Sequence, residues 1–262
     1  MKTFVLWTSV IVVFLSKNNM NLKNKIAVVT GASSGIGKAI AQALSQQECT
    51  VVLASRSTET LKEISQSLPH KSSVVTMDVS STDSVSQAFK EIYTTYDHID
   101  ILVNSAGIMP LTYIKNRHLD EWLDTIDVNV KGVLRCIYEV LPAMKKQNKG
   151  HIINIASVDG KELYEGGAVY GASKAALIAL SKALRMELSP EFNIRITAIE
   201  PGTVDTDLRE DITDQELLED KDYGGDEPKM DATAIAEAVV YAVQQPESVN
   251  VNELLLKPTG KS

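Results

Sequence analysis

Cysteine and histidine are scarce in this chain of 262 residues. The four histidines form no HxH or HxxxH pair, so we expect no metal site. The two cysteines, Cys49 and Cys136, are too few for a disulfide framework and show no CxxC spacing. A reducing compartment therefore suits the chain, and we expect a cytoplasmic protein.

The chain also lacks an excess of positive charge. It has 26 Lys and Arg residues against 34 Asp and Glu residues, a formal net charge of -8. No basic run is long enough to follow a phosphate backbone, so nucleic acid is not an expected partner. Much of the acidity lies in residues 205–227, which contain eleven acidic residues against Arg209 and Lys221. Two interpretations of this segment are open: a solvated acidic excursion, or a mobile lid over substrate.

No apolar run is long enough to cross a bilayer as a helix. The most apolar stretch, Phe4 to Leu15, has twelve residues, whereas a spanning helix needs about 20. For residues 1–19 we favour a dispensable leader or a mis-assigned start, with Met20 as the natural first residue. An interfacial anchor and a signal peptide are the alternatives, and a membrane is an expected partner only if the segment is retained as an anchor.

Linkers and internal repeats are absent as well, so we expect residues 20–262 to form one α/β domain. Short β-branched runs alternate with longer helical patterns from Lys25 onward. Strands are expected at 26–30, 50–54, 73–77, 101–104, 151–155, 194–199 and 251–256. Helices are expected at 37–47, 81–96, 119–146, 168–188 and 232–245. The alternation predicts a doubly wound parallel sheet of about seven strands with helices on both faces.

A glycine-rich turn, TGASSGIG at residues 30–37, joins the first expected strand to the first expected helix. Gly31 can make the tight turn, Gly35 lets the backbone approach a pyrophosphate, and Gly37 lets the helix pack close to the sheet. The helix N-terminus offers N–H donors and the positive end of its dipole to phosphates. The turn predicts a dinucleotide site whose contacts here are Gly31, Ser33, Ser34, Gly35, Ile36 and Gly37.

The end of the second expected strand favours NADP over NAD. An NAD site usually has Asp or Glu about 20 residues beyond the glycines, where it accepts hydrogen bonds from the ribose. This chain has Ser55 and Arg56 there instead. Arg56 can offer a planar fork of donors to a 2'-phosphate, assisted by the hydroxyls of Ser33 or Ser55. The alternative is a solvated loop arginine without this role.

Three polar side chains form a candidate catalytic group. Tyr170 and Lys174 are four residues apart in an expected helix and share one face, where a cation favours the phenolate form of the tyrosine. Ser157 follows the fifth expected strand, at the sheet edge where doubly wound folds bind ligands. Its hydroxyl can donate a hydrogen bond to a carbonyl oxygen.

These motifs together resemble a short-chain dehydrogenase/reductase over about residues 22–258. The turn at 30–37 matches the family's TGxxxGIG, Tyr170 and Lys174 match YxxxK, and Ser157 lies thirteen residues before the tyrosine. Asn129 matches the asparagine of the family's helix. Residues 104–107 read NSAG in place of NNAG, so Ser105 puts a sheet-stabilising contact in doubt.

The resemblance also implies further contacts with the cofactor. Asp78 and Val79 match the adenine-binding pair, and Pro201-Gly202 followed by Thr206 matches the PGxxxT segment that contacts the nicotinamide carboxamide. The contacts added in this way are Asp78, Val79, Asn104, Ala106, Gly107, Pro201, Gly202, Val204 and Thr206, together with Tyr170 and Lys174.

The function that the resemblance implies is hydride transfer between NADP and the carbonyl/alcohol pair of a small molecule, on a Rossmann-type fold. Tyr170 would exchange a proton with the substrate oxygen, while Lys174 would lower the tyrosine pKa and hold the nicotinamide ribose. Ser157 would orient the carbonyl, and Asn129 would support a proton relay. Both ketone or aldehyde reductases and alcohol or hydroxy-acid dehydrogenases fit, as a homo-oligomer (dimer or tetramer). The alternative is a non-catalytic dinucleotide-binding sensor or scaffold on the same fold.

The substrate is less clearly marked in the sequence than the cofactor. Met109 and Tyr113 follow the Gly107 turn and are candidates to border it, whereas Trp122 is expected to serve packing. The acidic segment should repel polyanionic substrates unless Arg209 or Lys221 turns inward. Neutral or cationic carbonyl compounds are therefore favoured.

Overall fold

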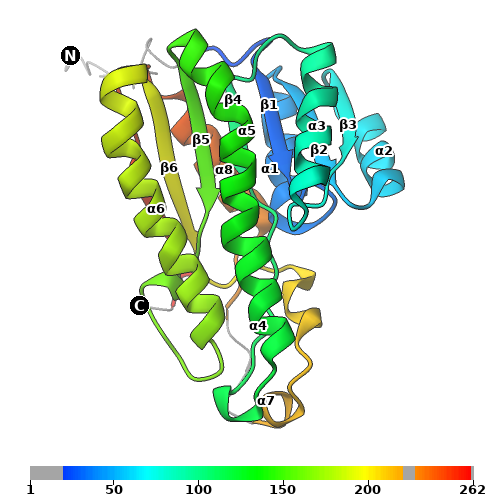
Figure 1. The fold of residues 1–262 in the computed structure, drawn as a ribbon, viewed down its shortest axis with the longest axis vertical. Coiled ribbons are helices and arrows are strands. Elements are labelled where there is room, and N and C mark those ends of the chain that lie inside the picture. Colours follow the sequence, from blue (N-terminus) through cyan, green and yellow to red (C-terminus); the bar gives the residue numbers. More distant parts are fainter. Residues whose placement is uncertain (1–19, 221–227, 261–262) are drawn as a thin grey trace, which may run out of the picture.

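The computed structural model describes residues 20–220 and 228–260. The leader at 1–19 and the last part of the acidic segment, 221–227, lie outside the described residues. Seven parallel strands form one sheet in the order β3-β2-β1-β4-β5-β6-β7 (Figure 1). They are β1 (Ile26–Thr30), β2 (Thr50–Ser55), β3 (Ser72–Thr76), β4 (Ile101–Asn104), β5 (Gly150–Ile155), β6 (Ile194–Pro201) and β7 (Glu253–Leu256). Strand order reverses between β1 and β4, so a ligand-binding switch point lies at their carboxyl ends.

Helices cover both faces of the sheet, which explains why the central strands are apolar along their whole length. All five residues of β1 are buried, with Val29 in register with Leu53 and Val103. One face is covered by α1 (Gly35–Gln46), α2 (Thr58–Ser67) and α8 (Ala232–Gln244). The other is covered by α3 (Thr82–Thr95), α5 (Gly132–Gln147) and α6 (Ala168–Phe192), which lie in front in Figure 1.

Shorter elements gather beyond the carboxyl ends of the strands, at the bottom of Figure 1. The helices there are α4 (Leu119–Ile126) and α7 (Gln215–Glu219). Short 3-10 turns, η1 (Ile114–Asn116), η3 (Val158–Gly160) and η4 (Asp207–Asp211), lie in the connecting loops. Among the described residues, no helix combines the length and apolar composition that a membrane span requires.

The helix expected at 119–146 is not continuous, which corrects the sequence prediction. A π-helical turn, η2 (Asp127–Lys131), separates α4 from α5. Arg135 fastens this turn by donating to the backbone oxygen and the carboxylate of Asp127 and to Val79 O. The apolar period runs through the interruption and does not reveal it. Single π turns are frequent at functional sites, and this one carries Asn129.

Helix α2 was not among the helices expected from the sequence. Its buried residues are Leu61 and Ile64, so its apolar pattern is short and weak. The remaining expected helices and the seven strands are confirmed, with ends that differ by a few residues.

Candidate active site

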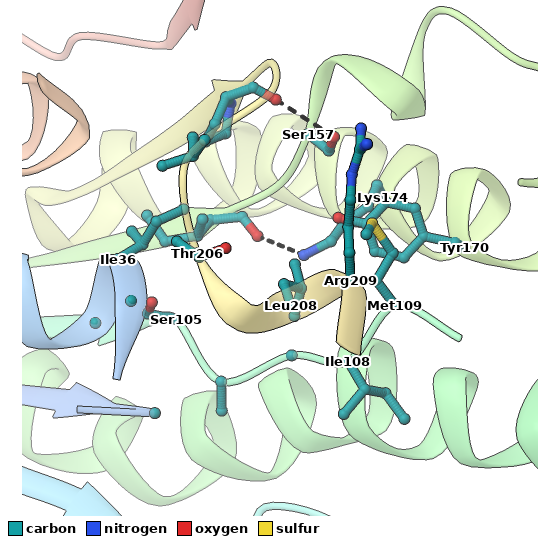
Figure 2. A pocket seen from close by; sticks show the side chains of 18 of the residues that line it. Ile36, Ser105, Ile108, Met109, Ser157, Tyr170, Lys174, Thr206, Leu208 and Arg209 are labelled. Carbon is teal, nitrogen blue, oxygen red and sulfur yellow. Dashed lines mark hydrogen bonds between the residues drawn. The ribbon is translucent and has the colours of Figure 1, made fainter. Parts of the chain in front are cut away.

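A cleft of about 840 Å³ lies at the carboxyl ends of the strands, at the switch point of the sheet. It is lined by the β1–α1 turn, the ends of β2, β5 and β6, the loop after β4, the start of α6, and η4. Figure 2 shows side chains from these elements converging on it. Of the site residues predicted from the sequence, all but Asn104 and Asn129 line this cleft.

The β1–α1 turn has a backbone that glycine alone fits well. Gly31 and Gly35 have φ of +66° and +47°, in the left-handed region. A Cβ on Gly31 would stand 2.8 Å from Ala106 Cα, and one on Gly37 would stand 2.2 Å from Gly31 O. The glycines therefore let the turn lie close to both the β4 loop and its own helix.

The N-terminus of α1 opens into this cleft and suits a diphosphate. Ser34, the N-cap residue, makes no side-chain hydrogen bond to the first turn. The N–H groups of that turn remain available to an anion, which the helix dipole also favours. Ser33, Ser34 and Ile36 line the cleft beside them. The residues present thus fit the phosphate part of a dinucleotide.

The cleft extends to the end of β2, where its lining includes a positive side chain just after the strand and no carboxylate from the strand. Ser55, Arg56 and Ser57 line it there, with Arg56 exposed. Asp78 lies opposite and accepts hydrogen bonds from the Ser80 hydroxyl at 2.7 Å and from Ser80 N at 2.9 Å. These bonds, with Arg56 and Arg135 nearby, hold the pKa of Asp78 below its usual range.

Asn104 is buried and is not among the residues that line the cleft, so its predicted cofactor contact stays a prediction. It lies at the buried end of β4, where its Nδ2 donates to Asn154 Oδ1 at 2.9 Å. Ser105, which raised a doubt in the motif, leaves the loop well held. Thr30 Oγ1 accepts hydrogen bonds from Ser105 N and Ala106 N, both at 3.1 Å.

The three predicted catalytic side chains meet in the cleft (Figure 2). Ser157, directly after β5, donates to Pro201 O at 3.3 Å and accepts from Asp159 N at 3.1 Å. Lys174 donates to Ile155 O at 2.9 Å, with its Nζ 5.6 Å from the centroid of the Tyr170 ring. Tyr170 and Lys174 both lie near the start of α6 and are almost wholly buried.

Burial controls the proton affinities of this pair. Burial raises the pKa of Tyr170 above its ordinary value, Asp159 raises it further, and a hydrogen bond with Ser157 opposes the change. Burial lowers the pKa of Lys174 to about 8, opposed by Asp159. Lys174 is not among the groups that shift the Tyr170 pKa here, and its ammonium donates to Ile155 O, so the lowering of the tyrosine pKa by Lys174 stays a prediction. At neutral pH Tyr170 keeps its proton and Lys174 its charge.

Asn129 acts beneath the cleft surface, so its predicted catalytic role is an indirect one. Its Oδ1 accepts from Ile108 N and its Nδ2 donates to Ile108 O, both at 2.9 Å, and Nδ2 also donates to Ser173 Oγ at 3.1 Å. Gly107 separates it from Lys174: a Cβ there would be 3.3 Å from Asn129 Oδ1 and 3.6 Å from Lys174 Nζ. Asn129 thus fixes the cleft wall next to the catalytic lysine.

The structure adds residues to the substrate end of the cleft that sequence reasoning missed. Met109 lines it as expected, whereas Tyr113 does not, and Trp122 donates to Thr112 Oγ1 away from it. The added lining residues include Leu111, Asp159, Leu163, Tyr164 and Leu208. The signal available for them was closeness in sequence to a predicted residue: Leu111 to Met109, Leu208 to Thr206, and the others to Ser157. Arg209, from η4, also lines the cleft, and its charge lies close enough to Asp159 to act on the pKa of that carboxyl.

Known proteins resemble this chain over nearly its whole length. An uncharacterized oxidoreductase of Staphylococcus epidermidis is 44% identical over 237 residues, covering 90% of this chain and 98% of the relative. An uncharacterized oxidoreductase of Staphylococcus saprophyticus is 41% identical over 246 residues, covering 92% and 99%.

Solved structures share the fold at lower identity. The closed form of a serine dehydrogenase complexed with NADP+ is 32% identical, with a TM-score of 0.83, covering 90% of this chain and 96% of that one. An alcohol dehydrogenase from Thermococcus sibiricus complexed with 5-hydroxy-NADP is 28% identical, with a TM-score of 0.80, covering 92% and 99%. The family model for short chain dehydrogenases matches residues 25–217. The chain therefore belongs to the short-chain dehydrogenase family and is an oxidoreductase.

Proposed function

We propose that the protein is an NADP-dependent enzyme that interconverts a small carbonyl compound and its alcohol. The convergence of Ser157, Tyr170 and Lys174 in the cleft that also receives the glycine-rich turn carries this proposal. NADP in two structural relatives supports the choice of cofactor. Arg56, at a position where NAD sites usually have a carboxylate, supports it independently.

The lining residues have distinct roles toward the cofactor. The α1 N-terminus would hold the diphosphate, Arg56 the 2'-phosphate, and Lys174 with the Pro201-Gly202 turn the nicotinamide half. When bound, NADPH supplies the hydride that reduces the carbonyl carbon. Burial of the reaction centre between β5, β6 and α6 excludes water from it.

Tyr170 and Ser157 act on the substrate oxygen. The Ser157 hydroxyl turns from Pro201 O to donate a hydrogen bond to that oxygen and polarises the carbonyl. Tyr170 then gives its proton to the same oxygen as the carbon is reduced, and solvent restores that proton afterwards. Because burial keeps the phenol protonated, we favour reduction as the direction at neutral pH. Oxidation of the alcohol is the reverse, with the tyrosine accepting the proton.

The acidic segment covers the substrate end of the cleft in this proposal. Leu208 and Arg209, both on η4, line the cleft, and η4 leads toward α7. Closure of such a segment would exclude water and retain the substrate. The sequence offers Gly224-Gly225 as a hinge for this motion, and these two residues lie outside the described residues.

A non-catalytic dinucleotide sensor would need the turn and Arg56 alone. It would have no use for a buried proton donor or for a serine aimed at a substrate oxygen. The intact group of Ser157, Tyr170 and Lys174 therefore favours the enzyme over the sensor.

Turnover of NADPH tests the proposal directly. We expect NADPH oxidation, followed by absorbance, with members of a panel of aldehydes, ketones and keto acids. Tyr170→Phe should lower turnover by about 10² to 10⁴-fold, because it removes the transferred proton but keeps the ring. NADPH affinity, measured by fluorescence, should change little. Tyr138→Phe, on an exposed tyrosine, is the matched control.

Two results would contradict the enzyme proposal. Tight NADPH binding without turnover of any panel member would favour the sensor. Equal turnover by Tyr170→Phe and the wild type would assign the proton donor to another residue.

A further inference from the structure

Asp159 places a carboxylate at the substrate end of the cleft that the reaction described above does not use. It lies on η3, two residues after Ser157, and lines the cleft together with Tyr164. The Tyr164 hydroxyl donates to Asp159 Oδ2 at 3.3 Å. The carboxylate is also close enough to Tyr170 and Lys174 to shift the proton affinity of both.

Two glycines fix the backbone that carries Asp159. A Cβ on Gly171 would stand 2.8 Å from Asp159 O, and one on Gly160 would stand 2.8 Å from Ala175 N. The turn η3 is therefore pressed against α6 within a turn of Tyr170. This close packing sets the position of the Asp159 carboxylate relative to the catalytic tyrosine and serine.

Asp159 is a carboxyl group in a partly desolvated place. Burial raises its pKa, while hydrogen bonds with Ser157 and Tyr164 and the charges of Lys174 and Arg209 oppose that change and favour the ionised form. A desolvated carboxylate costs free energy unless a cation or hydrogen-bond donors compensate it. Lys174 and Arg209 compensate it in part, and a cationic group on the substrate would add to that compensation.

The rest of the substrate end carries more negative than positive charge. The acidic lining residues there are Asp159, Glu162, Asp207, Glu210 and Asp211, against Lys174, Arg209 and Lys257. Such a surface attracts cations and disfavours anions. Asp159 is the member of this group that lies next to the reacting centre.

We propose that Asp159 selects substrates that carry a protonated amine on the carbon beside the reacting carbon, that is, amino ketones and the corresponding 1,2-amino alcohols. The inference rests on the proposed function. Ser157 takes the reacting oxygen, and the Asp159 carboxylate interacts with the Ser157 side chain, while Asp159 N donates to Ser157 Oγ at 3.1 Å. In a 1,2-amino alcohol the ammonium and the reacting oxygen are on adjacent carbons. With the oxygen bound to Ser157, the ammonium therefore lies near Asp159.

A matched set of alcohols tests this selection. With NADP+ as oxidant, we expect the wild type to oxidise 1-amino-2-propanol with a kcat/KM about tenfold or more above that of 1,2-propanediol, and lactate least well. A charge-assisted hydrogen bond is worth about 1.5–3 kcal/mol, or roughly 10 to 150-fold. Asp159→Asn should lower the ratio of kcat/KM for the amine to kcat/KM for the diol by about that factor, because a change that acts through Tyr170 and Lys174 affects both substrates and cancels in the ratio.

The control variant is Glu165→Gln, which makes the same change of charge on an exposed residue of the same loop, outside the cleft. It should keep the wild-type preference. Binding gives a second readout: 1-amino-2-propanol titrated calorimetrically into the NADPH-saturated protein, where no turnover follows, should bind the wild type and bind Asp159→Asn at least tenfold more weakly.

The outcomes separate this inference from the proposed function. Absence of turnover with every alcohol and carbonyl tested would overturn the proposed function and, with it, this inference. If the wild type turns over the diol or lactate in preference to the amine, the inference alone is overturned. This result uses the wild type only, so it holds even if Asp159→Asn does not fold. An equal loss for amine and diol in Asp159→Asn would make Asp159 a positioning residue for Ser157 and Tyr170.

Discussion

The side chains that we propose as catalytic are held by backbone groups of the sheet. Lys174 is bonded to Ile155 O on β5, and Ser157 is bonded to Pro201 O on β6. The two strands are paired in register, with Ile155 opposite Ile199. Strand pairing therefore sets the separation of the serine and the lysine, and a shift of β6 relative to β5 would disturb both.

Arg56 gives a test of cofactor choice at a single residue. Arg56→Asp replaces a donor to the 2'-phosphate with a repelling charge and restores the acid of an NAD site. The preference for NADPH over NADH, as a ratio of kcat/KM, should fall by about 10 to 150-fold, the value of one charge-assisted contact. Lys90→Asp, an exposed charge reversal outside the cleft, should leave the ratio unchanged. A ratio unaltered by Arg56→Asp would assign the preference to other residues.

The sequence identifies single residues whose positions follow from regular secondary structure. Tyr170 and Lys174 lie on one helix face, and Ser157 follows a strand, so their meeting could be predicted from spacing. Asp159 could not be placed in this way. Its position depends on the packing of η3 against Gly171 and Gly160, which is a tertiary contact without a sequence period.

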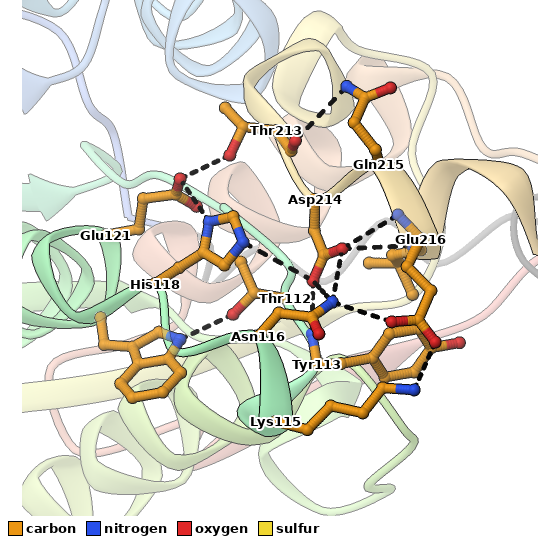
Figure 3. A network of polar contacts seen from close by, with 12 residues as sticks. Thr112, Tyr113, Lys115, Asn116, His118, Glu121, Thr213, Asp214, Gln215 and Glu216 are labelled. Atoms are coloured by element: carbon orange, nitrogen blue, oxygen red, sulfur yellow. Dashed lines mark hydrogen bonds and ion pairs between the residues drawn. The ribbon is translucent and has the colours of Figure 1, made fainter.

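A polar latch joins the loop after β4 to the acidic segment (Figure 3). Asp214, 2% exposed, accepts hydrogen bonds from Tyr113 N at 2.9 Å and from Asn116 Nδ2 at 2.9 Å. The same carboxylate caps α7 by accepting from Glu216 N at 3.1 Å and Leu217 N at 3.4 Å. A helix of five residues is not stable alone, so α7 depends on this carboxylate.

Further contacts extend the latch on both sides of Asp214. His118 lies 3.1 Å from Glu121 and 4.0 Å from Asp214, and the Thr213 hydroxyl donates to Glu121. Lys115 forms an ion pair with Glu216. These contacts tie the acidic segment to α4 and the loop before it, on the far side of η4 from the cleft wall.

Asp214→Asn should loosen the latch without unfolding the domain. The neutral amide is a weaker acceptor for the N–H groups that Asp214 now binds, at a cost of about 1.5–3 kcal/mol. Hydrogen exchange of amides at 213–219 should accelerate by about 10 to 150-fold, with less change in the sheet. Glu219→Gln, an exposed carboxyl on the same helix, is the matched control. Equal protection in both variants would show that apolar packing of Leu217 holds α7.

Elements were predictable from the sequence where their apolar period is strong. All seven strands and, except for α2, the helices that cover the sheet core were expected. The π turn at Asp127–Lys131 was hidden because its cause is the buried bonding of Asn129 to Ile108, which lies 21 residues earlier in the chain. The acidic segment gave no strong period, and its arrangement follows from the bonds to Asp214.

Buried polar groups also lie away from the cleft, where β5 and β6 begin. His151, 1% exposed, bonds through Nε2 to Thr197 Oγ1 at 2.8 Å, and that hydroxyl donates to Val251 O at 2.6 Å. Because the threonine proton is used on Val251 O, Nε2 of His151 is the donor. Burial lowers the pKa of the ring and keeps it neutral. Arg195, in the next strand, donates to Gln245 O and Val243 O. The interior of the whole domain therefore contains a histidine that must stay uncharged.

His151 makes the stability of the molecule depend on pH. Burial and the nearby charge of Arg195 hold its pKa well below 6.5, the ordinary value that it regains on unfolding. Below pH 6.5 the unfolded chain binds a proton that the folded chain does not, so stability is present above this pH and falls as the pH falls. Between pH 6.5 and 5.5 the free energy of unfolding should drop by about 1 kcal/mol from this residue. Urea denaturation of the wild type and of His151→Asn at both pH values measures this drop in the free energy of unfolding. The variant should show a smaller drop, by the part that His151 contributes. An equal drop in both proteins would assign the pH dependence to other groups.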